Sequence, residues 1–320
     1  MFGVASLLKR LFAFFLRARI HDKDALFDVG LDFFEGQQYD LAITCFNDVL
    51  RIDPNYANAY TFRGCAFFEK GDLDNALKSL NQAVQLNPSL KETVHLYLGN
   101  IYLKIGDTDH AIENYNQAIK IDPKCDRAYF MRATVYYRKA DLLFSASPRN
   151  AKNGKSYFDK SIKDINQVIQ MNPDHAGAYC QRGLTYLAYG DFDQAIQDYN
   201  EALQKLNPKE VAPEIYINRG IAYAKKSDPK HAVEDFKKAC KLNPKSALAY
   251  YKLAGAFSDM HDERHAIKYY SHAIRINPNY APAYYNRGMV YRKMGEIDHA
   301  IHDIERAKAI DPSLPLFRVR

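Results

Sequence analysis

Small and aromatic side chains recur along the chain at intervals of about 34 residues, with one longer interval. If each unit is counted from positions such as Lys23 and Ala57, position 11 is always aromatic: Phe33, Phe67, Tyr102, Tyr136, Tyr186, Tyr223, Phe257 and Tyr291. Positions 8 and 20 are small in every unit, as in Gly30 and Ala42. A proline closes each unit, from Pro54 to Pro312. The pattern predicts eight units, each with a helix A, a tight turn, a helix B and a loop.

Two segments carry a fuller signature, Tyr-x-x-Arg-Gly-x-x-Tyr, at Tyr179–Tyr186 and Tyr284–Tyr291. With this signature the chain resembles the tetratricopeptide-repeat (TPR) family over residues 23 to about 314. The resemblance implies an all-α, right-handed superhelical solenoid of eight units, whose A helices line a concave groove. It further implies a scaffold that binds a peptide or helix of another protein, with no enzymatic activity and no cofactor.

The repeats divide the chain into three parts. Residues 23–314 are the predicted solenoid, residues 1–22 form a basic amphipathic N-terminal helix, and residues 315–320 are a short tail. The fourth unit carries sixteen extra residues at about 141–156. Asp141–Ala146 suits an extension of helix A, whereas Ser147–Lys155 is polar and contains proline and glycine, which predicts a surface loop.

The N-terminal residues 2–20 are apolar and basic, with no acidic side chain. Their apolar run is too short and interrupted for a membrane-spanning helix, and no cleavage site for secretion follows. Three interpretations stay open: a cap on the first repeat, a helix lying on a membrane surface, and a cleaved organelle-targeting segment. The predicted localisation is cytoplasmic, with a membrane-peripheral location as the alternative.

The C-terminal repeat is followed by only eight residues after Pro312, which leaves no room for the solvating helix that usually ends such an array. One interpretation is that another chain covers this end, which would give self-association. The other is that the polar helix B of the last unit, with His302 and Arg306, stays uncovered.

Charge and cysteine content narrow the function classes. The net charge is +6, and four of the basic residues lie in the first twenty, so the body of the chain is close to neutral and shows no nucleic-acid footprint. The five cysteines are widely spaced and contain no Cys-x-x-Cys, which predicts reduced thiols.

Catalytic and metal-binding motifs are not recognisable in the sequence. His261 and His265 have the spacing of a zinc pair, but the intervening residues are in the wrong order and His261 falls at a turn. Gly154-Lys155-Ser156 lacks the upstream glycine and the preceding strand of a phosphate loop. Histidine also recurs just before the small residue of helix B, at His110, His231, His265 and His299. We predict no catalytic residue and no metal site.

Arginine at position 7 and aspartate at position 23 occur together. Four units hold both residues: Arg132 with Asp164, Arg182 with Asp198, Arg219 with Asp235, and Arg287 with Asp303. Units with an aliphatic residue at position 7 lack the aspartate. We predict a structural ion pair between the two helices of each unit, so these arginines are excluded from ligand binding.

The groove positions of helix A predict the binding surface. In the first half they are mostly apolar, and the predicted partner-binding groove is Phe27, Leu31, Phe34, Phe68, Leu96, Asn100, Leu103, Phe130 and Tyr137. Some TPR proteins hold chaperone tails with a lysine at position 5 and an asparagine at position 9. Here Asn100 is present, but Leu96 replaces the lysine, so the clamp for chaperone tails is not reproduced.

Overall fold

The computed structural model describes residues 22–87, 91–146, 151–207, 209 and 211–315. Contacts divide the chain into two compact units, Met1–Ala146 (unit 1) and Ser147–Arg320 (unit 2). Within the described residues the structure has sixteen α-helices and no strand, as an all-α repeat fold requires.

The helices follow one another in regular pairs. In unit 1 they are α2 (Lys23–Glu35), α3 (Tyr39–Ile52), α4 (Ala57–Glu69), α5 (Leu73–Leu86), α6 (Glu92–Ile105), α7 (Thr108–Ile121) and α8 (Asp126–Ala146). In unit 2 they are α9 (Ala151–Met171), α10 (Ala176–Tyr189), α11 (Phe192–Lys205), α12 (Pro213–Lys225), α13 (Pro229–Leu242), α14 (Ala247–Asp259), α15 (Glu263–Ile276), α16 (Ala281–Lys293) and α17 (Ile297–Ile310).

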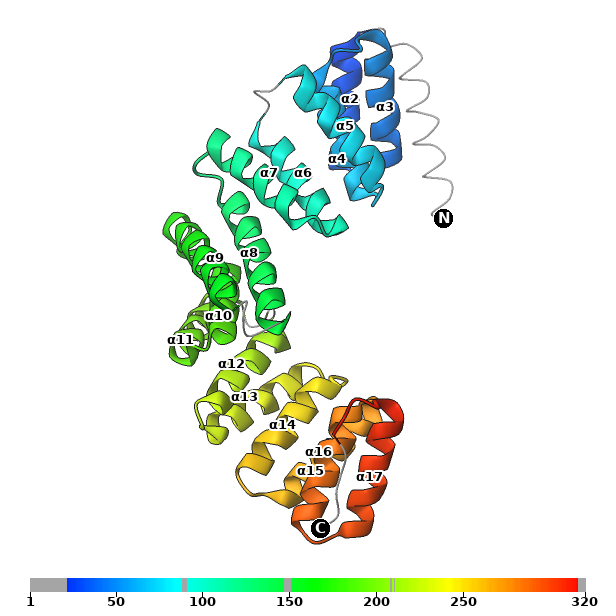
Figure 1. Cartoon of the computed structure of the whole chain (residues 1–320). Coiled ribbons are helices and arrows are strands. Elements are labelled where there is room, and N and C mark those ends of the chain that lie inside the picture. The colour runs from blue at the N-terminus through cyan, green and yellow to red at the C-terminus, as the bar shows by residue number, and fades with distance from the viewer. Residues whose placement is uncertain (1–21, 88–90, 147–150, 208, 210, 316–320) are drawn as a thin grey trace. The chain divides into compact units, whose positions relative to one another are not determined.

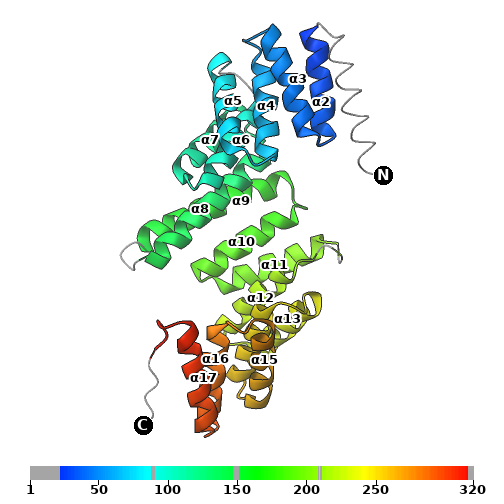
Figure 2. The same ribbon diagram turned by 90° about the vertical axis from the view of Figure 1, so that its right-hand side faces the viewer.

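Seven of the repeats lie within one unit, and each of these is a helical hairpin that stacks on its neighbours in that unit (Figures 1 and 2). Helix α2 pairs with α3, α4 with α5 and α6 with α7, and the A helices α2, α4 and α6 also contact one another in sequence. In unit 2 the A helices α10, α12, α14 and α16 contact one another in the same way. Since A helices are neighbours throughout, their side chains form one continuous face in each unit.

The hairpins close because a small residue on helix A lies against a large buried side chain on helix B. A Cβ placed on Gly99 would lie 2.5 Å from Tyr115, and one placed on Gly220 would lie 2.7 Å from Phe236. Tyr115 and Phe236 are almost completely buried. The small residue at position 8 therefore sets how closely the two helices approach, as its recurrence predicts.

The turn between helices A and B contains one residue in the left-handed region. Four turns use glycine, at Gly71, Gly106, Gly190 and Gly295, with φ between 82° and 94°. Gln37, Ser227 and His261 take the equivalent place in three other turns, with φ of 56–59°. An acid commonly follows and caps helix B, as Asp107 does by accepting the backbone N–H of His110 at 3.1 Å.

The predicted extension of helix A over Asp141–Ala146 is confirmed, whereas the predicted loop Ser147–Lys155 is wrong from Ala151 onward. Helix α8 continues to Ala146 and α9 already begins at Ala151, so the insertion lengthens both helices. The physical reason is the apolar period of α9, in which Gly154, Phe158 and Ile165 are all buried. The polar composition of this segment suggested a loop, but the helical spacing of buried residues already begins before Ser156, at Gly154.

Residues 1–21 lie outside the described residues, and so do 316–320. The cap, membrane and targeting interpretations of the N-terminal segment therefore stay predictions, as does self-association through the last repeat. No helix in the described part of the chain is long and apolar enough to span a bilayer.

Candidate functional site

The predicted groove residues are less exposed than an open apolar stripe would be. Phe27 is 9% exposed and packs against Phe46 and Phe62, with ring centroids 5.7 and 5.6 Å away. Leu96 is 6% exposed and belongs to a buried cluster with Tyr115. The remaining predicted residues, Leu31, Phe34, Phe68, Asn100, Leu103, Phe130 and Tyr137, are half-buried. Much of this set therefore contributes to helix packing.

Several of these side chains already have intramolecular contacts. The ring of Phe68 meets Tyr97 edge-on at 5.3 Å, and the ammonium of Lys104 lies over it at 4.3 Å. Asn100 accepts a hydrogen bond of 2.7 Å from the hydroxyl of buried Tyr115. Phe68 and Asn100 thus have structural partners, which the sequence pattern alone does not show.

Phe27 and Phe34 belong to a pocket in unit 1, on the face formed by the A helices. The pocket has a volume of about 330 Å³ and spans α2, α4 and α6. Its lining consists of Phe27, Phe34, Asn58, Thr61, Phe62, Cys65, Lys91, Thr93, Val94 and Tyr97. We call this cavity the apolar pocket. Its size lies at the lower end of ligand pockets, and it suits one or two apolar side chains.

The electrostatics of the apolar pocket favour an uncharged group. Lys91 is the single charged side chain of the lining, and it stands at the N-terminal end of α6. Burial raises the pKa of Cys65 far above its ordinary value, so the thiol stays neutral. Burial likewise raises the pKa of Tyr97, whose hydroxyl donates to Glu69 at 3.3 Å. The interior of the pocket is therefore neutral near pH 7.

Unit 2 has a different hollow on its A helices. Two adjoining cavities of about 640 and 180 Å³ lie between α12, α14 and α16 and share Gly255, Asp259, Tyr270 and Asn286. Lys225, Lys252, Arg292 and Lys293 also line them. We call this hollow the basic pocket, because four of its lining side chains are basic and one is acidic.

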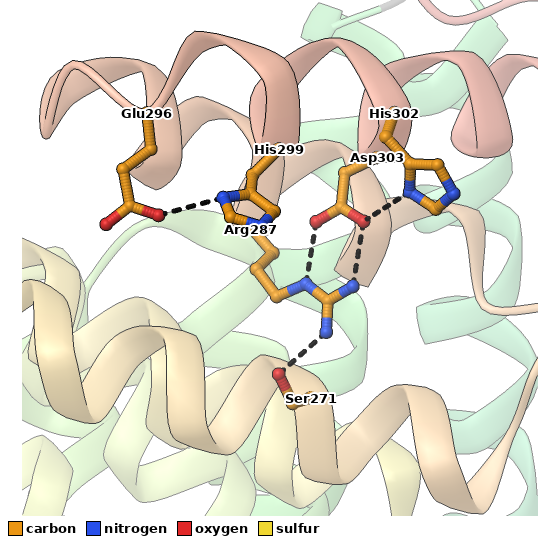
Figure 3. A network of polar contacts seen from close by, with 6 residues as sticks. All are labelled: Ser271, Arg287, Glu296, His299, His302 and Asp303. Carbon is orange, nitrogen blue, oxygen red and sulfur yellow. Dashed lines mark hydrogen bonds and ion pairs between the residues drawn. The ribbon is translucent and has the colours of Figure 1, made fainter.

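The structure brings three of the four predicted arginine–aspartate pairs together, each with two hydrogen bonds. Arg219 donates through Nε and Nη2 to Asp235 at 2.7 Å, and Arg182 donates to Asp198 at 2.8 and 2.6 Å. Arg287 donates to Asp303 at 2.6 and 2.7 Å (Figure 3). Arg132 lies in unit 1 and Asp164 in unit 2, so their pairing stays a prediction.

A second contact of each arginine, which the sequence pattern did not reveal to us, links it to the preceding repeat. Arg287 Nη1 donates to the hydroxyl of Ser271 on α15, as Figure 3 shows. Arg182 and Arg132 donate in the same way to Asn166 and Asn116. The signal is present in the sequence as asparagine or serine sixteen residues before these arginines. Position 7 therefore joins neighbouring hairpins as well as the two helices of its own repeat.

The recurring histidines have a structural place at the start of helix B. His110 stacks on Tyr102, with ring centroids 5.1 Å apart, and its Nδ1 lies 2.6 Å from a carboxylate oxygen of the capping Asp107. His231, His265 and His299 repeat this arrangement on Tyr223, Phe257 and Tyr291. Figure 3 shows the contact of His299 with Glu296. The stripe is thus a set of separate contacts at the start of helix B, each between a histidine and the acid three residues before it.

We expect the replacement of Asp107 by asparagine to lower the pKa of His110. The hydrogen bond and the charge of Asp107 raise that pKa above its ordinary value. A raised folded-state pKa means that the stabilising contribution of His110 is full below its unfolded pKa and is lost as the pH rises through the folded one. NMR titration of the His110 ring measures the shift. Asp109→Asn, in the same turn, is the control and should change the pKa much less.

The described residues do not support a metal site or a phosphate-binding loop. No three histidine, cysteine, aspartate or glutamate side chains gather there as a metal site requires. His265 is engaged by Asp262, while His261 lies 2.9 Å from the Lys293 ammonium. Lys155 and Ser156 are within helix α9, and the Lys155 ammonium lies over the ring of Tyr189.

Comparison with family models identifies the repeats. The model described as TPR repeat matches residues 30–68, 64–106, 99–139 and 265–295. The model described as Tetratricopeptide repeat matches residues 176–206, 213–246 and 281–314. Together these stretches cover well over half of the chain.

Similar proteins share the repeats over much of this chain. A TPR repeat-containing protein of Methanocaldococcus jannaschii is 26% identical over 282 residues, which is 71% of this chain and 46% of that protein. The Hsp70-Hsp90 organizing protein of Triticum aestivum is 24% identical over 73% of this chain and 36% of its own length. The chain thus spans less than half of either relative.

A solved structure supports the fold. A tetratricopeptide repeat protein from Parabacteroides merdae aligns with a TM-score of 0.57 and 16% identity, covering 87% of this chain and 98% of that one.

Proposed function

Because the chain belongs to the tetratricopeptide-repeat family, whose repeats are protein-interaction scaffolds, we propose that it binds a segment of a partner protein on the face of its A helices. The anchor of that segment is an apolar side chain that enters the apolar pocket of unit 1. The observation that carries the proposal is a neutral cavity of about 330 Å³ bounded by Phe27, Phe34 and Tyr97. Interfaces owe most of their affinity to a few such buried anchors.

The remaining features of the site agree with a partner of this kind. The lining of the pocket includes Asn58, an exposed residue near the start of α4. Lys91 at its edge can pair with an acid next to the anchor. The name of the wheat relative connects it with Hsp70 and Hsp90. Here Leu96 stands where the clamp of such proteins has lysine, so we propose a different type of segment.

A peptide selection tests the proposal. We expect a random peptide library, selected on the full chain, to yield peptides with an aromatic or large aliphatic residue. Asn58→Trp places a ring at the mouth of the pocket and should weaken these peptides at least tenfold, because losing a buried anchor costs about 2 kcal/mol or more. Asn81→Trp, also exposed and in the same repeat, is the matched control and should bind normally. Peptides that bind both variants equally would show that the pocket is not the site.

A second candidate function is that of a membrane-peripheral receptor or assembly factor. It rests on the basic, apolar character of residues 2–20. The test is sedimentation with anionic liposomes of the full chain and of a chain that begins at Lys23. The tether requires that only the full chain sediments, and equal recovery of both rejects it.

A further inference from the structure

The basic pocket of unit 2 contains two lysines that lack acidic partners. Lys225 ends helix α12 and Lys252 lies in the middle of α14, and both line the smaller cavity. In the described part of the chain neither lysine forms an ion pair, whereas the adjacent Lys226 is paired with Asp193. The lining of the smaller cavity therefore holds two cations and one acid, Asp259.

Both lysines line the same cavity, where Lys252 is half-buried and Lys225 is exposed. Burial, and then the charge of Lys225, lower the pKa of Lys252 below its ordinary value. An anion bound near both lysines would offset the burial and the repulsion that lower this pKa.

A hydroxyl group completes the set of donors. Tyr251 accepts a hydrogen bond of 2.8 Å from the amide of Asn286, so its own proton is free to be donated. Burial raises the pKa of Tyr251, which keeps that proton in place. Its ring packs against Tyr280 and Tyr270 at 5.2 and 5.8 Å, so its orientation is fixed.

We propose that the basic pocket binds the carboxylate of an acidic side chain on a partner protein. The carboxylate lies between Lys225 and Lys252 and accepts from Tyr251, since charge-assisted hydrogen bonds to two ammonium groups are strong. The smaller cavity, about 180 Å³, has room for one such side chain, and the larger one, about 640 Å³, receives its neighbours in the segment.

The pocket differs in construction from the chaperone-tail clamp. The clamp has lysine at position 5 of a repeat, and here Ile217 and Tyr251 occupy that position. Asp259, the acid shared by both cavities, disfavours anions placed beside it. The proposal does not depend on the apolar pocket of unit 1, because the residues of the two pockets are different.

Fluorescence anisotropy with the full chain tests the proposal. The probe is a labelled hexaglutamate peptide with both ends blocked, compared with hexaglutamine. Lys225→Gln/Lys252→Gln should weaken hexaglutamate at least tenfold, because two charge-assisted hydrogen bonds are lost. Lys230→Gln/Lys245→Gln removes the same charge at exposed sites outside the pocket and should change the affinity less than twofold.

Each other outcome is decisive. Equal losses in the two double variants would mean general charge attraction, and absence of hexaglutamate binding to the wild type would likewise overturn the proposal. A blocked phosphoserine peptide that binds more than tenfold tighter would assign the pocket to phosphate instead of carboxylate. In support, ¹⁵N NMR should show the pKa of Lys252 rising when hexaglutamate is added. Asn58→Trp should leave this binding intact, which separates the result from that of the apolar pocket.

Discussion

Replacement of Asp235 by alanine is expected to lower the free energy of unfolding by about 3–5 kcal/mol, because it leaves a buried cation without its counter-ion. Arg219 is 13% exposed and Asp235 is 2% exposed, and two hydrogen bonds of 2.7 Å join them. Burial opposes the charge of Arg219, but its hydrogen bonds and attraction to Asp235 prevail and raise its pKa. Once the aspartate is removed, the desolvation of the guanidinium remains without compensation.

Urea unfolding followed by circular dichroism measures this effect. Asp193→Ala, which removes the exposed partner of Lys226 in the same unit, is the control and should cost less than about 1 kcal/mol. A double replacement, Arg219→Met with Asp235→Leu, should recover at least half of the loss, because neither charge then remains buried. A loss below about 0.5 kcal/mol for Asp235→Ala, the scale of a surface substitution, would contradict the buried-pair account.

Gly220→Ala is expected to destabilise the protein by about 1–2 kcal/mol, although alanine is normally the better helix former. The added methyl group would lie 2.7 Å from Cε1 and 3.0 Å from Cδ1 of Phe236. Phe236 is 1% exposed and lies in a buried cluster of unit 2, so it cannot move away freely. The overlap forces helices α12 and α13 apart, and this outweighs the gain in helix propensity.

Gly255 provides the matched control in the same unit. It lies within α14, and a Cβ there would have only the Tyr270 hydroxyl nearby, at 3.7 Å. Gly255→Ala should therefore stabilise the protein by about 0.5–1 kcal/mol. Thermal unfolding of both variants measures the two shifts of the unfolding midpoint, which should have opposite signs. If both variants shift the midpoint in the same direction, close packing at position 8 is not what the glycine provides.

The hairpins and their ion pairs could be predicted from the sequence because they repeat. A pattern such as Arg182 with Asp198 appears several times in one chain, so the repeats act as an alignment of their own. The bond from Arg182 to Asn166 of the preceding repeat appears just as regularly, and we found it only in the structure. A search for residues that accompany the arginine in both directions along the chain would have found it.

The inserted residues and the groove could not be predicted as well. For the insertion, the polar composition of 147–155 concealed the helical spacing of buried residues that includes Gly154 and Phe158. For the groove, the position of a residue in the repeat predicts which way its side chain points but not how deeply that side chain is buried. Phe27 packs against three aromatic rings and Leu96 is buried, because neighbouring repeats cover part of the face. A pocket forms only where the side chains of three helices leave a space between them.

Photo-crosslinking of a selected peptide tests the central claim most directly. In the selected peptide, benzoylphenylalanine replaces a residue next to the apolar anchor, and mass spectrometry locates the crosslinks on the protein. We expect crosslinks to residues that line the apolar pocket, such as Asn58 and Lys91, and none to Asn81, which is exposed in the same repeat as Asn58 but outside the pocket. Crosslinks to Asn81 with none to the lining of the apolar pocket would contradict binding on the face of the A helices.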